Sequence, residues 1–338
     1  MKRLLVGALL GGALVAGGFV LRDFLDRPGP SELASPEAAA ARKATLRRIR
    51  PAMLDLLSSD VERQRKALDE HFYGPKIEEA RRLYAVVERP LEIEGIYTEV
   101  FEPEGGIPER NADRLLINLH GGAFSVGART EGRLESIPVA AVAGMRVVSV
   151  DYRQGPEHRF PAASEDVATV YRHFLEQYPP GNIGIFGCSA GGMLTGQATA
   201  WLDAQGLPRP GAIGIFCAGA GRFGVGDAAV ISETFGSRLG GGEIAYFEDA
   251  DWQDPLVAPI EDAELLSRFP PTLIITSTRD GALSSALMTH QRLVAAGAET
   301  RLHVYEGLDH YFFADTGLPE SLHVFDVIAR FFDTHLAR

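Results

Sequence analysis

Short apolar runs and amphipathic stretches alternate along the C-terminal two thirds of the chain. The apolar runs have the character of strands that are covered on both faces. They lie at residues 115–119, 146–151, 183–187, 213–218, 272–278 and 302–307. Between two of them, "SEDVATVYRHFLEQY" at residues 164–178 places apolar side chains three and four residues apart, which predicts a helix. The alternation predicts an α/β fold with a mostly parallel sheet and helices on both of its faces.

The N-terminus has a different pattern. Lys2 and Arg3 precede an uncharged and largely apolar run at residues 4–21. A membrane-spanning helix takes about 17 to 25 residues, and a basic start before an apolar run is also the pattern of a secretory signal. We therefore predict that residues 1–24 are a signal peptide or an N-terminal membrane anchor, and that the protein is exported, periplasmic or membrane-anchored. The alternative is a buried helix of the fold, although such a helix is usually amphipathic.

Residues 25–95 combine a linker with helical patterning. The stretch up to about residue 40 is rich in Pro, Ser, Ala and charge, which is typical of a linker. Helical spacing follows as far as about residue 85. Its run "ARKATLRRIR", at residues 41–50, carries basic side chains and no acid. Such a run is either a solvated helix face or a patch that contacts a membrane surface.

Composition limits the classes of function. The 338 residues are 46% hydrophobic and 23% charged, which fits a globular body with a sizeable core. The formal net charge of -12 would repel phosphates, so we exclude nucleic acids as partners. Cys188 and Cys217 are the only cysteines, too few for a disulfide framework or a zinc site.

A serine lies among glycines in "NIGIFGCSAGGMLTG", residues 182–196. Residues 187–191, "GCSAG", match G-x-S-x-G directly after an apolar run and directly before a helical pattern. This is the setting of a nucleophile elbow, in which glycines avoid clashes at a strained turn and the helix N-terminus adds a positive dipole. We predict that Ser189 is a nucleophile and that Cys188 is a packed small side chain. The alternative is a glycine-rich helix start that packs closely.

A second loop supplies backbone donors for an oxyanion. "HGGA", residues 120–123, follows another apolar run and is similar to the HGGG loop of lipases and esterases. The N–H groups of Gly121, Gly122 and Ala123, together with that of Ala190 after the serine, would face a developing oxyanion. The two loops occur about 70 residues apart and in the order that this chemistry requires.

The general base is expected after the acid, because this class of site takes its residues in the order serine, acid, histidine. We predict His310, in the loop "GLDHYFF" after an apolar run. The other late histidines fall inside predicted helices or strands: His290, His303, His323 and His335. The alternative for His310 is a loop histidine with a structural hydrogen bond.

The acid is expected to be Asp280, in "TSTRDGALSSA", because it too lies just past an apolar run. Asp309 is adjacent to His310 in the chain, where its carboxylate would have difficulty in reaching the imidazole Nδ1–H. Asp254, in "DWQDPLVAP", lies in a stretch flanked by Pro that is typical of a structural turn.

At these residues the chain resembles the hormone-sensitive-lipase-like esterases, a bacterial branch of the α/β-hydrolases. The resemblance covers roughly residue 115 to the C-terminus and rests on "HGGAF", "DYRQGPEHRFPAASEDV", "GCSAGG", "RDGALSSA" and "GLDHYFF". It implies hydrolysis of small or short-acyl carboxylic esters through an acyl-enzyme, without a cofactor. No cluster of ligands in the sequence supports metal catalysis. The resemblance also implies a helical cap over the site. The domains expected are thus a linker with cap helices at 25–95 and a catalytic domain at 96–338, with a cap insertion at about 222–253.

The chain departs from the family pattern in three places. The family usually has Asp or Glu where Cys188 stands, and Ala123 replaces a third glycine, although a backbone N–H survives there. After its acid the family commonly shows Asp-Pro-Leu, whereas here Leu283 comes one place late after Asp280. This last departure weakens the assignment of Asp280.

Other functions are also compatible with parts of the sequence. "GAGRFG", residues 219–224, is a literal G-x-G-x-x-G and would suggest a dinucleotide-binding oxidoreductase, but no strand with an acidic end follows at about 20 residues. A non-catalytic small-molecule-binding protein on the same fold would be expected to lack one of the three residues. A lactone or amide hydrolase would use the same serine, acid and histidine. The oligomeric state is not readable from the sequence.

Overall fold

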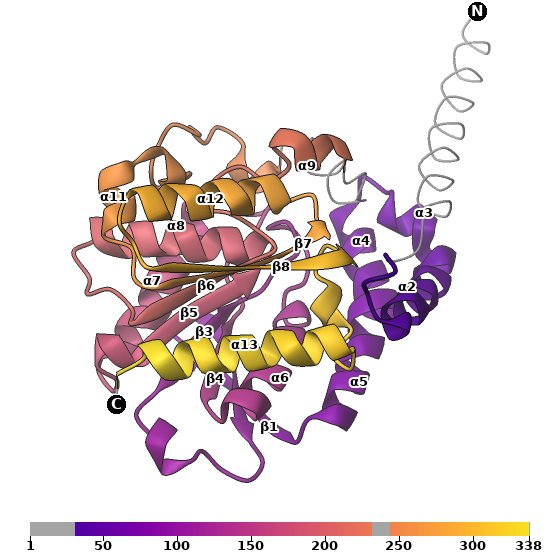
Figure 1. Ribbon diagram of the computed structural model, residues 1–338, viewed down its shortest axis with the longest axis horizontal. Helices are drawn as coiled ribbons and strands as arrows, with labels where there is room; N and C mark the ends of the chain where they lie inside the picture. The colour runs from indigo at the N-terminus through magenta and orange to yellow at the C-terminus, as the bar shows by residue number, and fades with distance from the viewer. Residues whose placement is uncertain (1–30, 232–243, 338) are drawn as a thin grey trace, which may run out of the picture.

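The computed structural model describes residues 31–231 and 244–337. Within them, one eight-stranded sheet lies between two layers of helices (Figure 1). The strand order is β1-β2-β4-β3-β5-β6-β7-β8. The strands are β1 (Val86–Ile93), β2 (Ile96–Pro103), β3 (Leu115–Leu119), β4 (Arg146–Val150), β5 (Ile183–Cys188), β6 (Ala212–Phe216), β7 (Thr272–Arg279) and β8 (Thr300–Asp309).

The sheet is parallel from β4 to β8, as the sequence predicts. Strand β2 alone runs in the opposite direction to the others, so it pairs antiparallel with both β1 and β4. All residues of β3, β5 and β6 are buried, which explains why their sequences are apolar without alternation. The sheet begins with β1, ten residues before the boundary at residue 96 that the sequence suggested, because β1 and β2 form an antiparallel hairpin across Glu94 and Gly95.

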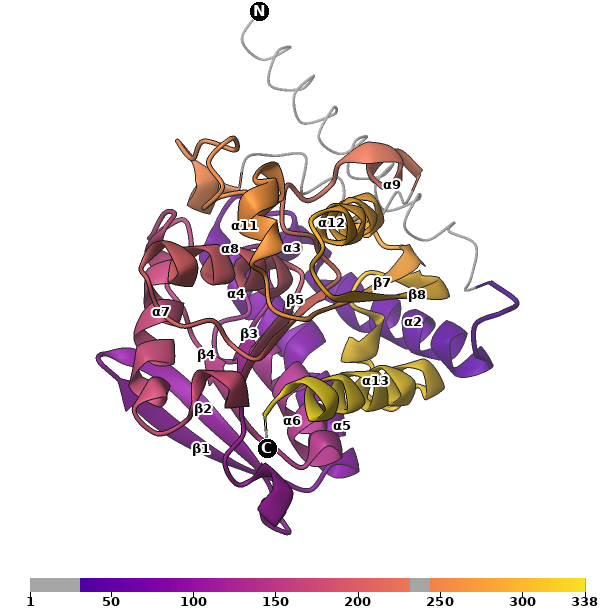
Figure 2. The same cartoon turned by 60° about the vertical axis from the view of Figure 1, so that its left-hand side comes forward.

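Helices cover both faces of the sheet (Figure 2). One layer holds α7 (Ala162–Leu175), α8 (Ala190–Ala204), α11 (Ala263–Ser267) and α12 (Leu283–Ala295). The other holds α6 (Glu131–Ala143) and α13 (Pro319–His335), with α5 (Gly74–Leu83) beside α6. Short helical turns connect these elements: η3 (Glu109–Asn111), η4 (Pro180–Asn182), η5 (Ala245–Phe247), η6 (Pro259–Glu261) and η7 (Phe312–Ala314).

The N-terminal segment packs as a group of helices beside the start of α6 (Figure 1). It comprises α2 (Pro36–Ile49), η1 (Arg50–Ala52), α3 (Met53–Leu56), α4 (Val61–Leu68), the π-helical turn η2 (Asp69–Tyr73) and α5. Ser35 and Asp60 cap α2 and α4 by accepting hydrogen bonds from first-turn N–H groups. Helix α2 thus starts inside the stretch that the sequence suggested as linker.

Two sequence predictions concern residues that the structure does not describe. The signal or anchor at residues 1–24 lies outside the described ranges. Of the proposed cap insertion at 222–253, the structure describes the first part, with α9 (Gly226–Ile231), and the last part, with η5. Across 31–231 and 244–337, no helix is both long and apolar enough to cross a membrane.

Candidate active site

Ser189 occupies the turn between β5 and α8. Its φ of 58° and ψ of −120° are strained for a residue with a side chain, as expected at a nucleophile elbow. The flanking glycines are required: a Cβ on Gly187 would lie 2.1 Å from the carbonyl oxygen of Leu119, and one on Gly191 only 1.7 Å from it. The turn therefore packs closely against the end of β3, and the glycines of the motif allow this close approach.

His310 follows directly after β8 and reaches Ser189 from the other side. Its Nε2 lies 2.9 Å from Ser189 Oγ, and its Nδ1 lies 2.7 Å from Asp280 Oδ1. Because an ionised carboxylate only accepts hydrogen bonds, Nδ1 carries the hydrogen and Nε2 is left to accept from the serine hydroxyl. The structure thus brings the three predicted residues into one hydrogen-bonded chain.

Asp280 is fully buried just past β7. Besides His310, it accepts hydrogen bonds from the Thr276 hydroxyl at 3.0 Å and from the backbone N–H of Ala282 at 2.8 Å. Burial by itself raises the pKa of this carboxyl, but the charge of His310 and these donors outweigh it and hold the pKa below 3.8. Asp280 is therefore ionised at neutral pH. The off-register leucine at 283 does not disturb this contact.

The pKa of His310 moves in the opposite direction. Burial lowers it, but the charge of Asp280 and its hydrogen bond raise it more, and Glu131 and Asp309 add to the increase. The net effect is a pKa above 6.5. The site therefore stabilises the imidazolium that forms when His310 takes a proton.

The two rival acids have other partners. Asp309 Oδ2 accepts a hydrogen bond from Arg42 Nε of α2 at 3.0 Å. Asp254 Oδ1 accepts from the backbone N–H of Leu256 at 2.8 Å, which is the structural turn that its sequence indicated. In this geometry Asp280 alone of the three contacts the imidazole.

The candidate oxyanion loop follows β3 in an unusual conformation. Gly122, Ala123 and Phe124 all have positive φ values, and a Cβ on Gly122 would lie 2.1 Å from the carbonyl oxygen of Val126. In the chain described here, the backbone N–H groups of Gly122, Ala123 and Ala190 donate no hydrogen bond to the protein. Together with Gly121, these are the donors that the sequence predicts for an oxyanion.

The long motif that starts at Asp151 supports this loop, a role the sequence did not suggest. The Tyr152 hydroxyl donates to the His120 carbonyl at 2.6 Å, and the two rings stack at 4.2 Å. The N–H of Gly155 donates to the carbonyl of Phe124 at 2.7 Å. His120 Nδ1 donates in turn to the Gly121 carbonyl at 2.7 Å. The segment therefore fixes the backbone at both ends of the glycine pair.

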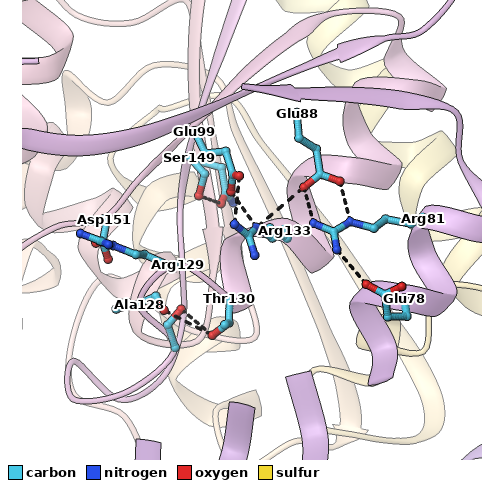
Figure 3. A network of polar contacts seen from close by, with 12 residues as sticks. Glu78, Arg81, Glu88, Glu99, Ala128, Arg129, Thr130, Arg133, Ser149 and Asp151 are labelled. Carbon is cyan, nitrogen blue, oxygen red and sulfur yellow. Dashed lines mark hydrogen bonds and ion pairs between the residues drawn. The ribbon is translucent and has the colours of Figure 1, made fainter. Parts of the chain in front are cut away.

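A polar network attaches the start of α6, and α5 beside it, to the first two strands of the sheet (Figure 3). Arg133 of α6 makes two hydrogen bonds to Glu99 of β2, at 2.8 and 3.0 Å. Arg81 of α5 makes two to Glu88 of β1, both at 2.7 Å. Paired bonds of this kind fix direction as well as distance. The start of α6 is thereby attached to β2 and placed beside α5.

The sequence did not indicate a role at the site for two further residues. The ring of Phe223 meets the imidazole of His310 edge-on, with centroids 5.4 Å apart. It lies in "GAGRFG", whose Gly219 packs against α12: a Cβ there would lie 2.4 Å from Ser285 Oγ. That glycine therefore serves packing in a loop. The second residue is Glu131, which is buried behind the oxyanion loop.

One group of potential metal ligands occurs among the residues described. Cys217, Asp280 and His310 have ligand atoms within 4.8 Å of one another. The carboxylate of this group is already hydrogen-bonded to the imidazole, and the imidazole to Ser189. Both cysteines are buried free thiols.

Known proteins show the same sequence pattern. The alpha/beta hydrolase fold family matches residues 116–314. An acetyl-hydrolase of Streptomyces hygroscopicus is 29% identical over 236 residues, which cover 67% of this chain and 78% of that protein. An esterase of Acinetobacter venetianus is 26% identical over 254 residues, which cover 72% of this chain and 80% of that protein.

Solved structures of esterases have a similar fold. A crystal structure of an esterase named E25 is 33% identical, covers 92% of this chain and 97% of its own, and superposes with a TM-score of 0.78. An esterase described as a member of the bacterial hormone-sensitive lipase family is 24% identical, with 90% and 99% covered and a TM-score of 0.75, which shows the same fold.

Proposed function

The chain belongs to the alpha/beta hydrolase fold family and is a carboxylic ester hydrolase, and on this basis we propose that Ser189, His310 and Asp280 form its catalytic triad. The observation that carries the proposal is the continuous chain of hydrogen bonds from Ser189 Oγ through the imidazole to Asp280. The strained backbone at Ser189 supports it, because residues with side chains in such strained conformations cluster at active sites.

The reaction follows from this geometry. Ser189 Oγ attacks the acyl carbon while His310 Nε2 accepts its proton, and Asp280 stabilises the imidazolium. The imidazolium then gives its proton to the leaving alcohol, which leaves an acyl-enzyme on Ser189. Water, activated by the neutral imidazole, attacks the acyl-enzyme, and the proton returns to Ser189 as the carboxylic acid departs. No cofactor is needed for either half-reaction.

The charge that develops on the carbonyl oxygen needs donors. The N–H groups of Gly122, Ala123 and Ala190 are unused within the described chain, and Ala190 stands at the N-terminus of α8. Gly121 completes the loop. One such donor is commonly worth about 10² to 10³ in kcat, so this loop carries a large share of the rate enhancement.

Small or short-acyl esters are the proposed substrates. A relative named acetyl-hydrolase supports this class. So does Phe223, whose ring stands edge-on to His310 and occupies space beside the reacting atoms. Bulky acyl chains would have to displace this ring.

The proposal is tested with a fluorophosphonate and a series of 4-nitrophenyl esters of increasing acyl length. We expect labelling of the wild type and fastest turnover of the short esters. Ser189→Ala should abolish labelling and lower kcat on the order of 10⁴-fold or more, because triad members act as a unit. Ser267→Ala, which removes an exposed hydroxyl on α11, is the matched control. Undiminished turnover by Ser189→Ala, or labelling of that variant at Cys188, would show that the nucleophile is another residue.

A further inference from the structure

Glu131, the first residue of α6, lies directly against the oxyanion loop. Its side chain is 2% exposed. A Cβ on Gly121 would lie 2.2 Å from Glu131 Oε1, and a Cβ on Gly127 would lie 2.7 Å from Oε2. The carboxylate thus fills the space between two glycines, one of which belongs to the oxyanion loop. A fully buried carboxylate is costly unless it is paired, so its presence here calls for a role.

The N-terminal helices hold this carboxylate from behind. The Tyr73 hydroxyl of η2 donates to Glu131 Oε2 at 3.0 Å. Four residues earlier, Asp69 Oδ1 accepts from the hydroxyl of Thr130, the neighbour of Glu131, at 2.8 Å. Four residues earlier again, Arg65 of α4 donates to the Ser125 carbonyl at 2.8 Å. One side of the N-terminal segment therefore contacts residues 125–131, which follow the oxyanion loop, at three points.

The charge of Glu131 acts on the catalytic histidine. The carboxylate is close enough to raise the pKa of His310, and His310 in turn lowers that of Glu131. Burial is the larger effect on Glu131 and raises its pKa to about 7, although the hydrogen bond from Tyr73 works against this. The titratable groups that face Glu131 are Tyr73, Glu135, Tyr152, Cys188, His310 and Tyr311.

We propose that Glu131 is a positioning residue of the active site, which supports Gly121 of the oxyanion loop, stabilises the imidazolium of His310, and is itself held by Tyr73 of the N-terminal segment. This inference rests on the proposed triad and extends it to a second buried acid. Tyr73 makes the N-terminal helices part of the catalytic structure, because they fix the group that fixes the loop. Neither Glu131 nor Tyr73 touches the reacting atoms.

The test is the pH dependence of ester hydrolysis by Glu131→Gln in the full chain. Glutamine keeps the shape and still accepts from Tyr73, but it carries no charge. The pKa of His310 should fall, so the acid limb of kcat/KM should move to lower pH. At the plateau kcat should fall on the order of tenfold, since a misplacement of about 1 Å costs about 10²-fold and the change here is smaller. A purely structural role would lower the plateau without moving the limb.

Glu135→Gln is the matched control. Glu135 lies one turn further along the same face of α6 and is also buried, but it accepts a hydrogen bond from Asn118 of β3 instead of one from Tyr73. Burial raises its pKa well above 4.5. The acids that raise the pKa of His310 are Asp280, Glu131 and Asp309, so replacing Glu135 should leave that pKa unchanged. We expect the acid limb of this variant to coincide with that of the wild type.

Tyr73→Phe tests the same link without changing Glu131. Loss of the hydroxyl raises the pKa of Glu131 further, so the carboxylate is less ionised near neutral pH. We expect kcat to fall severalfold near pH 7 and to recover at alkaline pH. A loss that is equal at all pH values would overturn the proposal, even if Glu131→Gln did not fold.

The outcomes separate the two proposals. If the wild type is not labelled by a fluorophosphonate at Ser189, the proposed function fails. If the wild type is labelled and hydrolyses esters, but Glu131→Gln retains both the wild-type plateau and the wild-type acid limb, the role of Glu131 alone is refuted. Equal shifts of the limb in Glu131→Gln and Glu135→Gln would also refute it, because the effect would then not depend on contact with the loop.

Discussion

Glu131→Gln should make the folded protein more stable at neutral and alkaline pH, although it impairs catalysis. A buried carboxyl with a raised pKa binds its proton more tightly in the folded chain than in the unfolded one. The stability that this contributes is complete below the unfolded pKa of 4.5 and is lost as the pH rises to about 7. At about 1.4 kcal/mol for each pH unit, the wild type loses about 3 kcal/mol across this window. Glutamine does not titrate and avoids the loss.

The assay is urea unfolding followed by the fluorescence of Trp201 and Trp252, repeated from about pH 5 to about pH 8. The free energy of unfolding of Glu131→Gln should exceed that of the wild type by an amount that grows through this range and levels off above about pH 7, the folded pKa of Glu131. Glu176→Gln, at the exposed end of α7, is the control for the removal of one acidic charge. A difference in unfolding free energy between Glu131→Gln and the wild type that is independent of pH would refute the reasoning. It would mean that the Glu131 carboxylate has the same pKa in the folded and the unfolded chain.

Two further predictions concern the triad. Asp280→Asn should lower kcat on the order of 10⁴-fold, since the amide favours the wrong imidazole tautomer and removes the negative charge. Asp254→Asn, which changes the turn residue, should retain wild-type turnover. The reverse result would mean that another acid orients His310. For the wild type, kcat/KM should fall as the pH drops through the pKa of His310, because His310 acts as a base only when it is neutral. Asp280 raises this pKa above 6.5. A midpoint below 6.5 in the pH profile of 4-nitrophenyl acetate hydrolysis would contradict this.

The parts of the fold that depend on local pattern were predictable from sequence. The strands β3 to β7 coincide with the apolar runs because most of their residues are buried and tolerate few polar side chains. The apolar run at 302–307 also marked β8, although that edge strand is only partly buried. The hairpin of β1 and β2 was missed because β1 is largely exposed and "VERPLEI" carries charges and a proline. An edge strand of this kind lacks the apolar signal that identified the others.

The candidate site was predictable where chemistry requires a fixed backbone. Positions 187 and 191 require glycine because the carbonyl of Leu119 lies too close for a side chain, so the sequence motif indicates this contact. Asp280 was the weakest assignment, because an aspartate after a strand has no such signature, and the Asp280–His310 contact depends on how β7 and β8 are paired. The motif at 151–167 could be recognised but not explained, since its contacts reach back to the loop at residues 120–124.

Glu131 illustrates a signal that single motifs do not contain. Residues 131, 134, 135 and 138 lie on one face of α6, so the buried Leu134 and Pro138 place Glu131 and Glu135 on the buried side by helical periodicity alone. Two acids on an apolar face are expensive to bury, which by itself marks the helix as unusual. Gly127 supplies the second half of the signal. A side chain there would collide with Oε2 of Glu131, as one at Gly121 would with Oε1, so a glycine outside the oxyanion motif is present for the same carboxylate. Buried acids and otherwise unexplained glycines are thus best interpreted together, because each accounts for the other.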